Sequence, residues 1–366
     1  MNSGATVDVP LGDDSYSIHI GTGLLDHMGE LFEARAGQRG AIITSDRLHP
    51  LYGKRVEQAL ADGGWELEVL QVPDGESAKN LGLAGELCES LAKGGCDRGS
   101  VVFALGGGVI GDLAGFVAAI YMRGIDFVQL PTTLLAQADA SVGGKVAVDL
   151  PQGKNLVGAF HQPAAVYIDT DTLHTLPERH MRAGMAEVIK HAIIADEALF
   201  EFISQNIDSI YSRDSETLKH LLQRNCQIKV DVVQKDPHDR GLRAVLNLGH
   251  TIGHALERAA GEWTLHHGEA VASGIIAETQ LACELGLCAP ETLNRIKTLI
   301  DAAKIAPNLS TIHPGKAEAA IERDKKISDG RLSLPLVHDI GDVRIVDTVD
   351  IGEIQSAMLE ALPPPK

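Results

Sequence analysis

The sequence predicts an α/β amino-terminal domain with a mostly parallel, Rossmann-like sheet and a mainly α-helical carboxyl-terminal domain. In the first half, short apolar runs alternate with amphipathic stretches, a pattern typical of parallel strands covered by helices. After residue 178 the pattern becomes almost entirely helical. The chain has 366 residues, and single cores stop growing at roughly 250–300 residues. We therefore expect domains at 1–178 and 179–366, with the active site in the cleft between them.

The individual elements follow from apolar runs and the turn residues that bound them. We expect strands at 16–20, 41–44, 66–72, 101–105, 127–130 and 165–168, and helices at 52–62, 78–93 and 111–121. From 178 to about 326 we expect helices. Proline and glycine should interrupt them near Asp236-Pro237, Gly261, Ala289-Pro290 and His313-Pro314. A pair of short strands at 332–337 and 343–346 completes the pattern.

The composition excludes several classes of protein. Hydrophobic residues make up 44% of the chain and its mean hydropathy is +0.02, as in ordinary soluble globular proteins. No apolar run reaches the roughly 18–20 residues that span a bilayer, so we expect no membrane partner. The amino terminus lacks the basic and apolar regions of a signal peptide. The five cysteines are irregularly spaced and lack a CxxC pair, which indicates reduced thiols in the cytoplasm.

The net charge of −18 argues against nucleic-acid binding, which needs a basic surface. Against this acidic background, several cations lie in or beside motif segments. Any one of them could be an ordinary surface residue, but together they suggest a cationic pocket for a small anionic molecule. These cations are Arg123, Lys145, Lys154, Lys190, Lys229 and Arg243.

One carboxylate and a group of histidines suggest a catalytic metal centre. Glu187, His250, His254 and His267 offer the ligand types of an open divalent-metal site, typically zinc. Because His250 and His254 are four residues apart, a helix would place both on one face. In a chain with 15 histidines, such a pair can also arise by chance from ordinary core or surface residues. Both histidines follow a glycine, a poor helix former, which suggests close approach of the backbone to a ligand.

A glycine-rich turn suggests a nucleotide site. The apolar strand at 101–105 runs directly into Gly106, Gly108 and Gly111, which fit the pattern G-x-G-x-x-G before a helix. Glycines let the backbone approach a pyrophosphate, and a helix amino terminus supplies N–H donors. Asp126 comes too early to be the acidic residue expected about 20 positions on. We therefore expect a variant nucleotide site, and the alternative is a tight turn needed only for packing.

The order of these motifs resembles the 3-dehydroquinate synthases, within the wider sugar-phosphate cyclase family. The resemblance runs from about residue 16 to 346, and so many motifs in one order make it specific. The matching motifs are Asp74-Gly75-Glu76-x-x-Lys79, Gly106-Gly107-Gly108-Val109-Ile110-Gly111-Asp112, Arg123-Gly124, Gly143-Gly144-Lys145, Gly153-Lys154-Asn155, Gly184-x-Ala186-Glu187-x-x-Lys190, Arg243-x3-Asn247-x-Gly249-His250-x3-His254, His267-Gly268-Glu269 and Asp324-Lys325-Lys326.

The resemblance implies a phosphorus–oxygen lyase that converts 3-deoxy-D-arabino-heptulosonate 7-phosphate to 3-dehydroquinate and phosphate. The family uses NAD catalytically together with one divalent metal ion, Zn2+ or Co2+. The implied steps are transient oxidation, β-elimination of phosphate, re-reduction and an intramolecular aldol cyclisation. The implied setting is the shikimate pathway to chorismate and the aromatic amino acids, in a cytoplasmic homodimer.

Matching the motifs position by position implies a role for each residue. Glu187, His250 and His267 would bind the metal, and His254 would face the substrate instead of serving as a fourth ligand. The implied catalytic residues are His254, Asp239, Lys145 and Arg243. The implied substrate-binding residues are Arg123, Asp139, Lys145, Asn155, Lys190, Lys229, Arg243, Asn247, His254, Lys325 and Lys326. The implied cofactor-binding residues are Asp74, Gly75, Glu76, Ser77, Ala78, Lys79, Gly107, Gly108, Val109, Ile110, Gly111, Asp112, Thr132, Thr133, Lys145, Lys154, Thr172, Leu173, His174 and Thr175.

The chain departs from the family pattern at a few positions. Asp239 stands where the family usually has glutamate, which keeps the charge but shortens its reach by one methylene, a gap that water can bridge. Ala138 and Val146 replace the usual valine and threonine. His266 beside His267 leaves the choice of ligand open, although the Gly-Glu-Ala that follows favours His267.

Three alternatives remain at this stage. A sister sugar-phosphate cyclase of secondary metabolism would change the substrate-binding residues, whereas Arg243, Asn247, Lys145 and Lys190 are in place here. A metal-dependent polyol dehydrogenase would release NADH stoichiometrically and would need fewer cations. A catalytically silent NAD-binding protein would not need the intact metal ligands.

Overall fold

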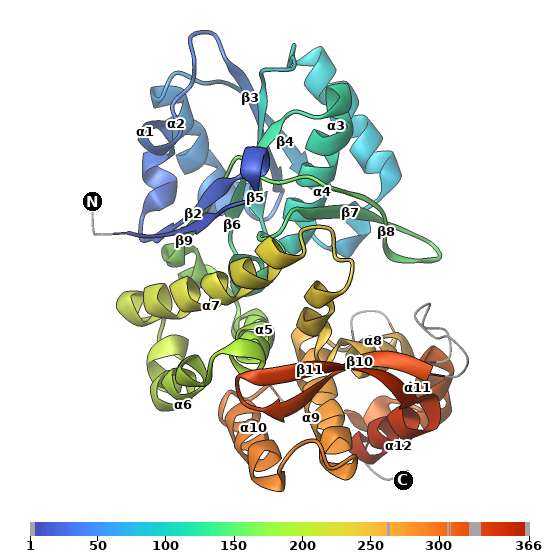
Figure 1. The fold of residues 1–366 in the computed structure, drawn as a ribbon. Coiled ribbons are helices and arrows are strands. Elements are labelled where there is room, and N and C mark those ends of the chain that lie inside the picture. Colours follow the sequence, from blue (N-terminus) through green and yellow to red (C-terminus); the bar gives the residue numbers. More distant parts are fainter. Residues whose placement is uncertain (1–3, 262–263, 306, 308, 322–330, 363–366) are drawn as a thin grey trace. The chain divides into compact units, whose positions relative to one another are not determined.

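The computed structural model describes residues 4–261, 264–305, 307, 309–321 and 331–362. The chain divides into two compact units (Figure 1). The first contains Met1–Leu176 and Ser215–Val230, and the second contains Pro177–Asp214 and Asp231–Lys366. The domain division at residue 178 and a site between the domains stay predictions.

The first unit contains a seven-stranded sheet in the order β1-β2-β9-β6-β5-β3-β4. Every neighbouring pair is parallel except β1 with β2, so the predicted mostly parallel sheet is confirmed. The sequence did not predict β1, because it is a short edge strand with exposed polar positions. The strands are β1 Ala5–Val9, β2 Tyr16–Gly21, β3 Arg39–Ser45, β4 Glu66–Val72, β5 Val101–Gly106, β6 Asp126–Pro131 and β9 Ala165–Asp169.

Both faces of the central strands are buried, which explains why β3, β5, β6 and β9 are apolar runs without alternation. On one face, Ile42 and Phe103 pack in a core with α1 (Met28–Leu31) and α2 (Lys54–Asp62). Their chain neighbours Ile43 and Val102 face the other way. They pack in a second core with α3 (Leu81–Lys93) and α4 (Gly108–Ile120). In Figure 1, α1 and α2 lie on one side of the sheet, and α3 and α4 lie on the other.

The strand order reverses beside β5. From β3 the chain moves outward to β4, then returns past β3 to β5 and continues in the opposite direction to β6 and β9. Open α/β sheets bind ligands outside the carboxyl ends of their strands at such a reversal. The glycine-rich turn between β5 and α4 lies at this position.

A separate hairpin follows β6 in the chain. Its strands β7 (Lys145–Leu150) and β8 (Gly153–Phe160) pair antiparallel. The sequence did not predict it, since β8 is half-exposed or exposed along its length and carries glycine, lysine and asparagine among its apolar residues.

The second unit is mainly helical, as predicted. Its helices include α5 (Glu178–Ala195), α6 (Glu197–Tyr211), α8 (His250–Ala260) and α9 (His267–Glu284), and α9 packs against α5, α8, α10 and α12. The remaining elements are α10 Pro290–Ala302, α11 Pro314–Ile321, the paired strands β10 Arg331–Asp339 and β11 Asp342–Asp350, and α12 Ile351–Ala361. Helix α7 (Ser215–Lys235) begins in the first unit and ends in the second.

The predicted helix breaks are confirmed, because α7 ends before Asp236 and both Pro290 and Pro314 begin helices. The sequence missed the break at Asp196, whose side chain caps α6 by accepting from Leu199 N at 3.0 Å. It also missed α12, which Asp350 caps. Within the described residues, no helix has both the length and the apolarity needed to cross a bilayer.

Candidate functional site

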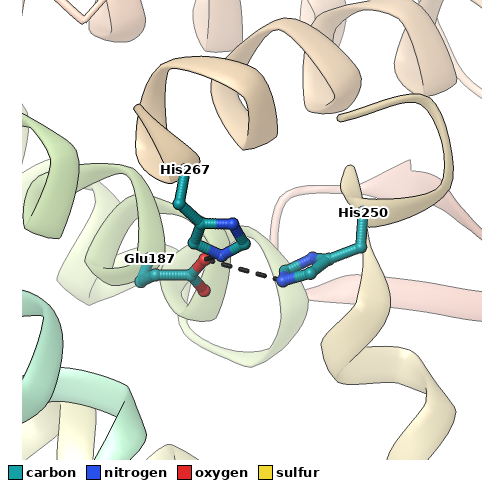
Figure 2. Close-up of side chains that lie close together, drawn as sticks. All are labelled: Glu187, His250 and His267. Carbon is teal, nitrogen blue, oxygen red and sulfur yellow. Dashed lines mark ion pairs between the residues drawn. The ribbon is translucent and has the colours of Figure 1, made fainter. Parts of the chain in front are cut away.

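Three helices of the second unit bring Glu187, His250 and His267 together (Figure 2). Glu187 lies within α5, His250 begins α8 and His267 begins α9. The Nε2 atoms of His267 and His250 lie 3.2 and 3.7 Å from Oε1 of Glu187. One donor atom from each residue can be chosen so that all lie within 4.8 Å of one another. One carboxylate and two neutral imidazoles are suitable ligands for a catalytic divalent metal, so the arrangement fits such an ion.

Lys190 balances the charge of the buried carboxylate. Glu187 is 0% exposed, and Nζ of Lys190, one turn further along α5, lies 2.5 Å from its Oε2. A carboxylate without water needs a partner of opposite charge. Because Lys190 contacts Oε2, the other oxygen, Oε1, faces both histidines.

His250 is held in its neutral form. Burial lowers its pKa to about 3, and the positive charge of Lys190 adds to this effect. Its Nδ1 lies 3.1 Å from the carbonyl oxygen of Leu248, which fixes Nδ1–H as the donor. The unprotonated Nε2 then faces Glu187, as a metal ligand requires.

His267 lies between two carboxylates. Its Nε2 faces Glu187 and its Nδ1 lies 3.4 Å from Oε1 of Glu257. Burial alone would lower the pKa of His267, but hydrogen bonds to Glu187 and Glu257 outweigh it and raise the pKa to about 10. The site therefore favours a positive charge at this position, and a metal ion would have to displace the proton from Nε2.

The adjacent His266 has a different role. Its backbone nitrogen donates to Oε2 of Glu269 at 2.9 Å, at the start of α9. Its ring lies against His180, with centroids 5.0 Å apart. The geometry therefore places His267, and not His266, beside Glu187.

His254 lies one turn beyond His250 on the exposed side of α8. Its ring centroid is 5.3 Å from that of His250 and 5.8 Å from that of His267. A ring nitrogen of His254 lies within 4.8 Å of possible ligand atoms of Glu257 and His267. Glu187 instead lies within that distance of His250 and His267. Its predicted role beside the substrate stays a prediction.

Glycines set the distances between these helices. A Cβ atom on Gly268 would lie 2.0 Å from the carbonyl oxygen of Ala183, so α9 approaches α5 closely next to His267. A Cβ on Gly274 would lie 2.0 Å from the carbonyl oxygen of Gly249, and one on Gly253 would lie 3.0 Å from Ala270 O. The glycines before the histidines allow α8 to pack against α9, and the expectation that they also allow approach to a ligand stays a prediction.

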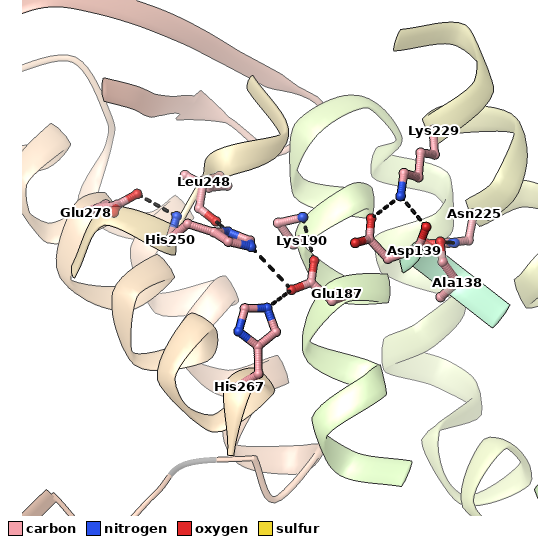
Figure 3. A network of polar contacts seen from close by, with 11 residues as sticks. Ala138, Asp139, Glu187, Lys190, Asn225, Lys229, Leu248, His250, His267 and Glu278 are labelled. Atoms are coloured by element: carbon pink, nitrogen blue, oxygen red, sulfur yellow. Dashed lines mark hydrogen bonds and ion pairs between the residues drawn. The ribbon is translucent and has the colours of Figure 1, made fainter. Parts of the chain in front are cut away.

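Glu278 anchors the start of α8 (Figure 3). This residue of α9 is 0% exposed, and its carboxylate accepts hydrogen bonds from Gly249 N at 2.5 Å and from Ile252 N at 3.4 Å. A carboxylate at a helix amino terminus satisfies unpaired N–H groups and interacts favourably with the helix dipole. Sequence reasoning missed Glu278 and Glu257. A charged residue inside the apolar stretch 270–282 was the signal available for Glu278.

The other predicted substrate residues of the second unit lie near the start of α8. Arg243 is 3% exposed, and its backbone nitrogen donates to Oδ2 of Asp236 at 3.1 Å. Asn247 ends the 3-10 turn Leu242–Asn247, and Asp239 lies in the preceding bend with a φ of 54°. Lys325 and Lys326 lie outside the described residues.

Within the first unit, Lys229 on α7 forms an ion pair with Asp139 at 2.8 Å, and Figure 3 shows its second bond to the Asp139 carbonyl. Lys229 is 5% exposed, so the pair is largely shielded from water. The remaining predicted substrate residues of this unit are Arg123 at the end of the turn Tyr121–Arg123, Lys145 at the start of β7, and Asn155 on β8.

The predicted cofactor residues gather at one edge of the sheet. They follow the carboxyl ends of β4, β5, β6 and β9, and the hairpin β7–β8 supplies two more. They are Asp74 to Lys79 after β4, Gly107 to Asp112 at the start of α4, Thr132 and Thr133 after the end of β6, Thr172 to Thr175 in the turn after β9, Lys145 on β7 and Lys154 on β8.

Lys79 connects several of these segments. Its Nζ lies 2.5 Å from Oδ2 of Asp112 and also donates to Oδ1 of Asn155. Burial raises the pKa of Asp112, and Lys79 partly offsets this. A second ion pair joins Lys154 to Glu76 at 3.7 Å.

The glycines of the turn divide into two groups. A Cβ on Gly106 would lie 2.6 Å from side-chain atoms of Ile110, and one on Gly111 would lie 2.8 Å from Oε1 of Gln129. These glycines are therefore needed for packing, the alternative considered for this motif. Gly107 and Gly108 lie at the amino terminus of α4, where backbone N–H groups are available to a phosphate.

Comparison with known families matches both halves of the chain. The family model described as 3-dehydroquinate synthase N-terminal matches residues 69–183, and the C-terminal model matches residues 184–327. The chain belongs to the 3-dehydroquinate synthase family. The predicted family is thus confirmed, and so is the predicted fold class.

Curated members of the family match the chain over nearly its full length. The 3-dehydroquinate synthase of Geobacter metallireducens is 44% identical over 350 residues, which cover 95% of this chain and 97% of the relative. The synthase of Desulforamulus reducens is 43% identical over 355 residues, which cover 96% and 99%.

Solved structures share the fold. The 2-epi-5-epi-valiolone synthase of Streptomyces hygroscopicus, with NAD+ and Zn2+ bound, has a TM-score of 0.86 and 29% identity over 95% of this chain and 96% of its own. A 2-deoxy-scyllo-inosose synthase has a TM-score of 0.90, 24% identity and coverage of 98% and 100%. Glycerol dehydrogenase from Schizosaccharomyces pombe, at a TM-score of 0.67, 16% identity and coverage of 94% and 88%, shows a similarity of fold alone.

Proposed function

We propose that the chain converts 3-deoxy-D-arabino-heptulosonate 7-phosphate to 3-dehydroquinate and phosphate, with NAD and one divalent metal ion bound. Membership of the family across both halves supports this reaction. The observation that carries the proposal is the cluster of Glu187, His250 and His267, with Lys190 paired to the carboxylate. Such a cluster is needed for metal-assisted chemistry and is not needed for NAD binding alone.

Glu187, His250 and His267 would hold Zn2+ or Co2+. A divalent ion in such a site polarises substrate oxygens and lowers the pKa of a hydroxyl. His250 is neutral and directed by Leu248, and His267 is directed by Glu257, so each imidazole presents Nε2 to the same point. Lys190 limits the negative charge of the site when no ion is bound.

The segments at the carboxyl edge of the sheet would hold NAD, which accepts a hydride from the substrate and later returns it. The amino terminus of α4 offers N–H donors to the pyrophosphate. Lys79 and Lys154 add positive charge beside it, and their partners Asp112 and Glu76 orient them.

The chain's other cations would bind the phosphate and carboxylate of the substrate through charge-assisted hydrogen bonds. In the second unit, Glu187 holds the ammonium group of Lys190, and the carbonyl oxygen of Pro237 accepts from the guanidinium of Arg243, which lowers the entropy lost on binding. His254 would exchange a proton with a substrate hydroxyl, and Asp239 would act through water. The proposed substrate set is Arg123, Asp139, Lys145, Asn155, Lys190, Lys229, Arg243, Asn247, His254, Lys325 and Lys326.

The family resemblance supports two further proposals, a cytoplasmic location and a homodimer. The five free thiols agree with a reducing compartment. The net charge of −18 argues against nucleic acid as a partner, and the cations gathered in the motif segments support a small anionic substrate.

A phosphate-release assay tests the reaction. The purified chain with NAD+, Zn2+ or Co2+ and the heptulosonate phosphate should release inorganic phosphate and form 3-dehydroquinate. The valiolone synthase at 29% identity supports a second candidate, a sister cyclase with another sugar phosphate as substrate. Phosphate release from other sugar phosphates, with none from the heptulosonate, would favour that candidate.

A further inference from the structure

Two of the five cysteines lie together at the end of α9. Cys283 is half-buried in the last turn of the helix, and Cys288 is 7% exposed. The Sγ atoms of both lie 3.6 Å from the same carbonyl oxygen, that of Ala289. Both side chains therefore contact one backbone atom. The four residues between them hide this pair from a search for CxxC motifs.

The backbone at the end of α9 explains why the thiols meet. Gly286 has a φ of 71°, and its nitrogen donates to the carbonyl oxygen of Cys283 at 3.0 Å. The nitrogens of Leu287 and Cys288 both donate to the carbonyl oxygen of Ala282, at 2.8 and 3.2 Å. These bonds form a Schellman motif, which folds the chain back over the last helical turn. Cys288 is thereby held beside Cys283.

The next helix holds the second thiol from the other side. Pro290 begins α10 directly after Ala289, and its fixed φ restricts the backbone that follows Cys288. Both α9 and α10 belong to the second unit, so the geometry of the pair is set within one compact body.

We propose that Cys283 and Cys288 form a reactive thiol pair that a two-electron oxidant, hydrogen peroxide, converts to a disulfide. The more exposed Cys283 attacks the peroxide, the O–O bond breaks, and a sulfenic acid and one water form. The sulfur of Cys288 then attacks the sulfenic sulfur, and a second water leaves as the S–S bond forms. Two thiols and one peroxide thus give one disulfide and two waters.

The surroundings favour this outcome over further oxidation. Cys288 is buried whereas Cys283 is half-buried, so the oxidant reaches Cys283 first. Both Sγ atoms lie 3.6 Å from the carbonyl oxygen of Ala289, which keeps Cys288 close to a sulfenic acid formed on Cys283. Neither residue belongs to the proposed metal, cofactor or substrate set.

Mass spectrometry of the folded, full-length protein tests the proposal. The protein is treated with graded hydrogen peroxide, its remaining thiols are alkylated, and the digest is mapped. We expect a cross-linked Cys283–Cys288 peptide, lighter by two hydrogen atoms than the reduced pair and restored by dithiothreitol. In Cys288→Ser, Cys283 should instead accumulate sulfinic acid.

Cys88→Ser is the matched control, because Cys88 is a half-buried thiol on α3 in the first unit. This variant should form the Cys283–Cys288 disulfide as the wild type does. The proposal is wrong if both thiols are recovered singly alkylated or singly oxidised at a peroxide concentration that oxidises Cys88. It is equally wrong if Cys288→Ser leaves the amount of sulfinic acid on Cys283 unchanged. Circular dichroism of each serine variant shows that the fold is retained.

Discussion

The carboxylate of Glu278 accepts a hydrogen bond from the backbone nitrogen of Gly249 at 2.5 Å. Gly249 directly precedes His250, so a buried carboxylate on α9 fixes the backbone that presents one proposed metal ligand. Backbone and side chain of His250 are then both constrained, since Leu248 orients the imidazole.

Glu278→Gln should weaken metal binding. Gly249 N and Ile252 N bond to different oxygens of the carboxylate, and the amide replaces one of these with an NH2 group. A buried donor left without an acceptor costs about 1–3 kcal/mol. We expect the affinity for Zn2+ or Co2+ to fall about 10- to 100-fold, as for other residues that orient metal ligands. Competition with a chelator measures the affinity. Glu284→Gln, an exposed change on the same helix, should leave it unchanged, and equal affinities in the two variants would contradict this role.

Gly274→Ala should destabilise the second unit. The new Cβ would lie 2.0 Å from the carbonyl oxygen of Gly249, so α8 and α9 must move apart. Such overpacking typically costs about 1–3 kcal/mol. Gly85→Ala on α3 is the control, because its Cβ would meet nothing within 4 Å. That variant should gain roughly 0.5–1 kcal/mol from helix propensity. Urea unfolding measures the free energy of unfolding of both variants. A free energy of Gly274→Ala equal to that of the wild type would contradict the close packing of α8 and α9.

The pair of Lys79 and Asp112 should couple cofactor binding to stability. Lys79→Met leaves the largely buried carboxylate of Asp112 without its cation, a loss of about 3 kcal/mol for such pairs. The double variant Lys79→Met, Asp112→Asn should recover most of that stability but not the affinity for NAD. Denaturation and NAD titration of the single and double variants separate the two effects. If the double variant binds NAD as tightly as the wild type, Lys79 does not contribute to the cofactor site.

His19 should make the first unit less stable in mild acid. Burial lowers its pKa below 6.5, against a smaller opposite effect of Asp8, and its ring stacks on Tyr167 at 4.8 Å. The unfolded chain therefore binds a proton more readily, so His19 costs no stability above pH 6.5 and destabilises the fold as pH falls below it. His19→Phe keeps the stacking and should reduce the loss of stability between pH 7 and about 5.5. Urea unfolding at each pH gives the free energy of unfolding. If its change with pH is the same in His19→Phe as in the wild type, His19 is not the group responsible. His27→Asn on the exposed surface is the control.

The parts of the fold that the sequence predicted well are those with strong local signals. The buried run before Gly106 predicted β5, and proline predicted the starts of α10 and α11. The edge strand β1 and the hairpin β7–β8 carry polar residues on exposed faces, so their apolar periodicity is weak.

The residues of the candidate site also include some that the sequence predicted and some that it did not. Glu187, His250 and His267 were predictable from residue type and motif order, and the structure brings them together. Glu257 and Glu278 were not, because their partners lie on another helix or across the helix connection and no local pattern connects them. The packing role of the glycines was missed for a similar cause, since sequence alone did not place α9 against α8.

His250→Ala should remove metal binding with the fold intact. Only two of the proposed ligands would remain, so we expect the affinity for the ion to fall by more than the roughly 100-fold that a change outside the ligand set produces. Metal analysis, phosphate release and circular dichroism measure the three effects. His27→Ala is the matched control, and full metal content in His250→Ala would overturn the ligand set.

The ratio of phosphate released to NAD supplied tests the central claim most directly. With NAD+ limiting and metal present, a cyclase regenerates its cofactor in every turnover. We expect many equivalents of phosphate and 3-dehydroquinate for each NAD+, with no net accumulation of NADH. Stoichiometric NADH without release of phosphate would contradict the proposal and identify the chain as a dehydrogenase.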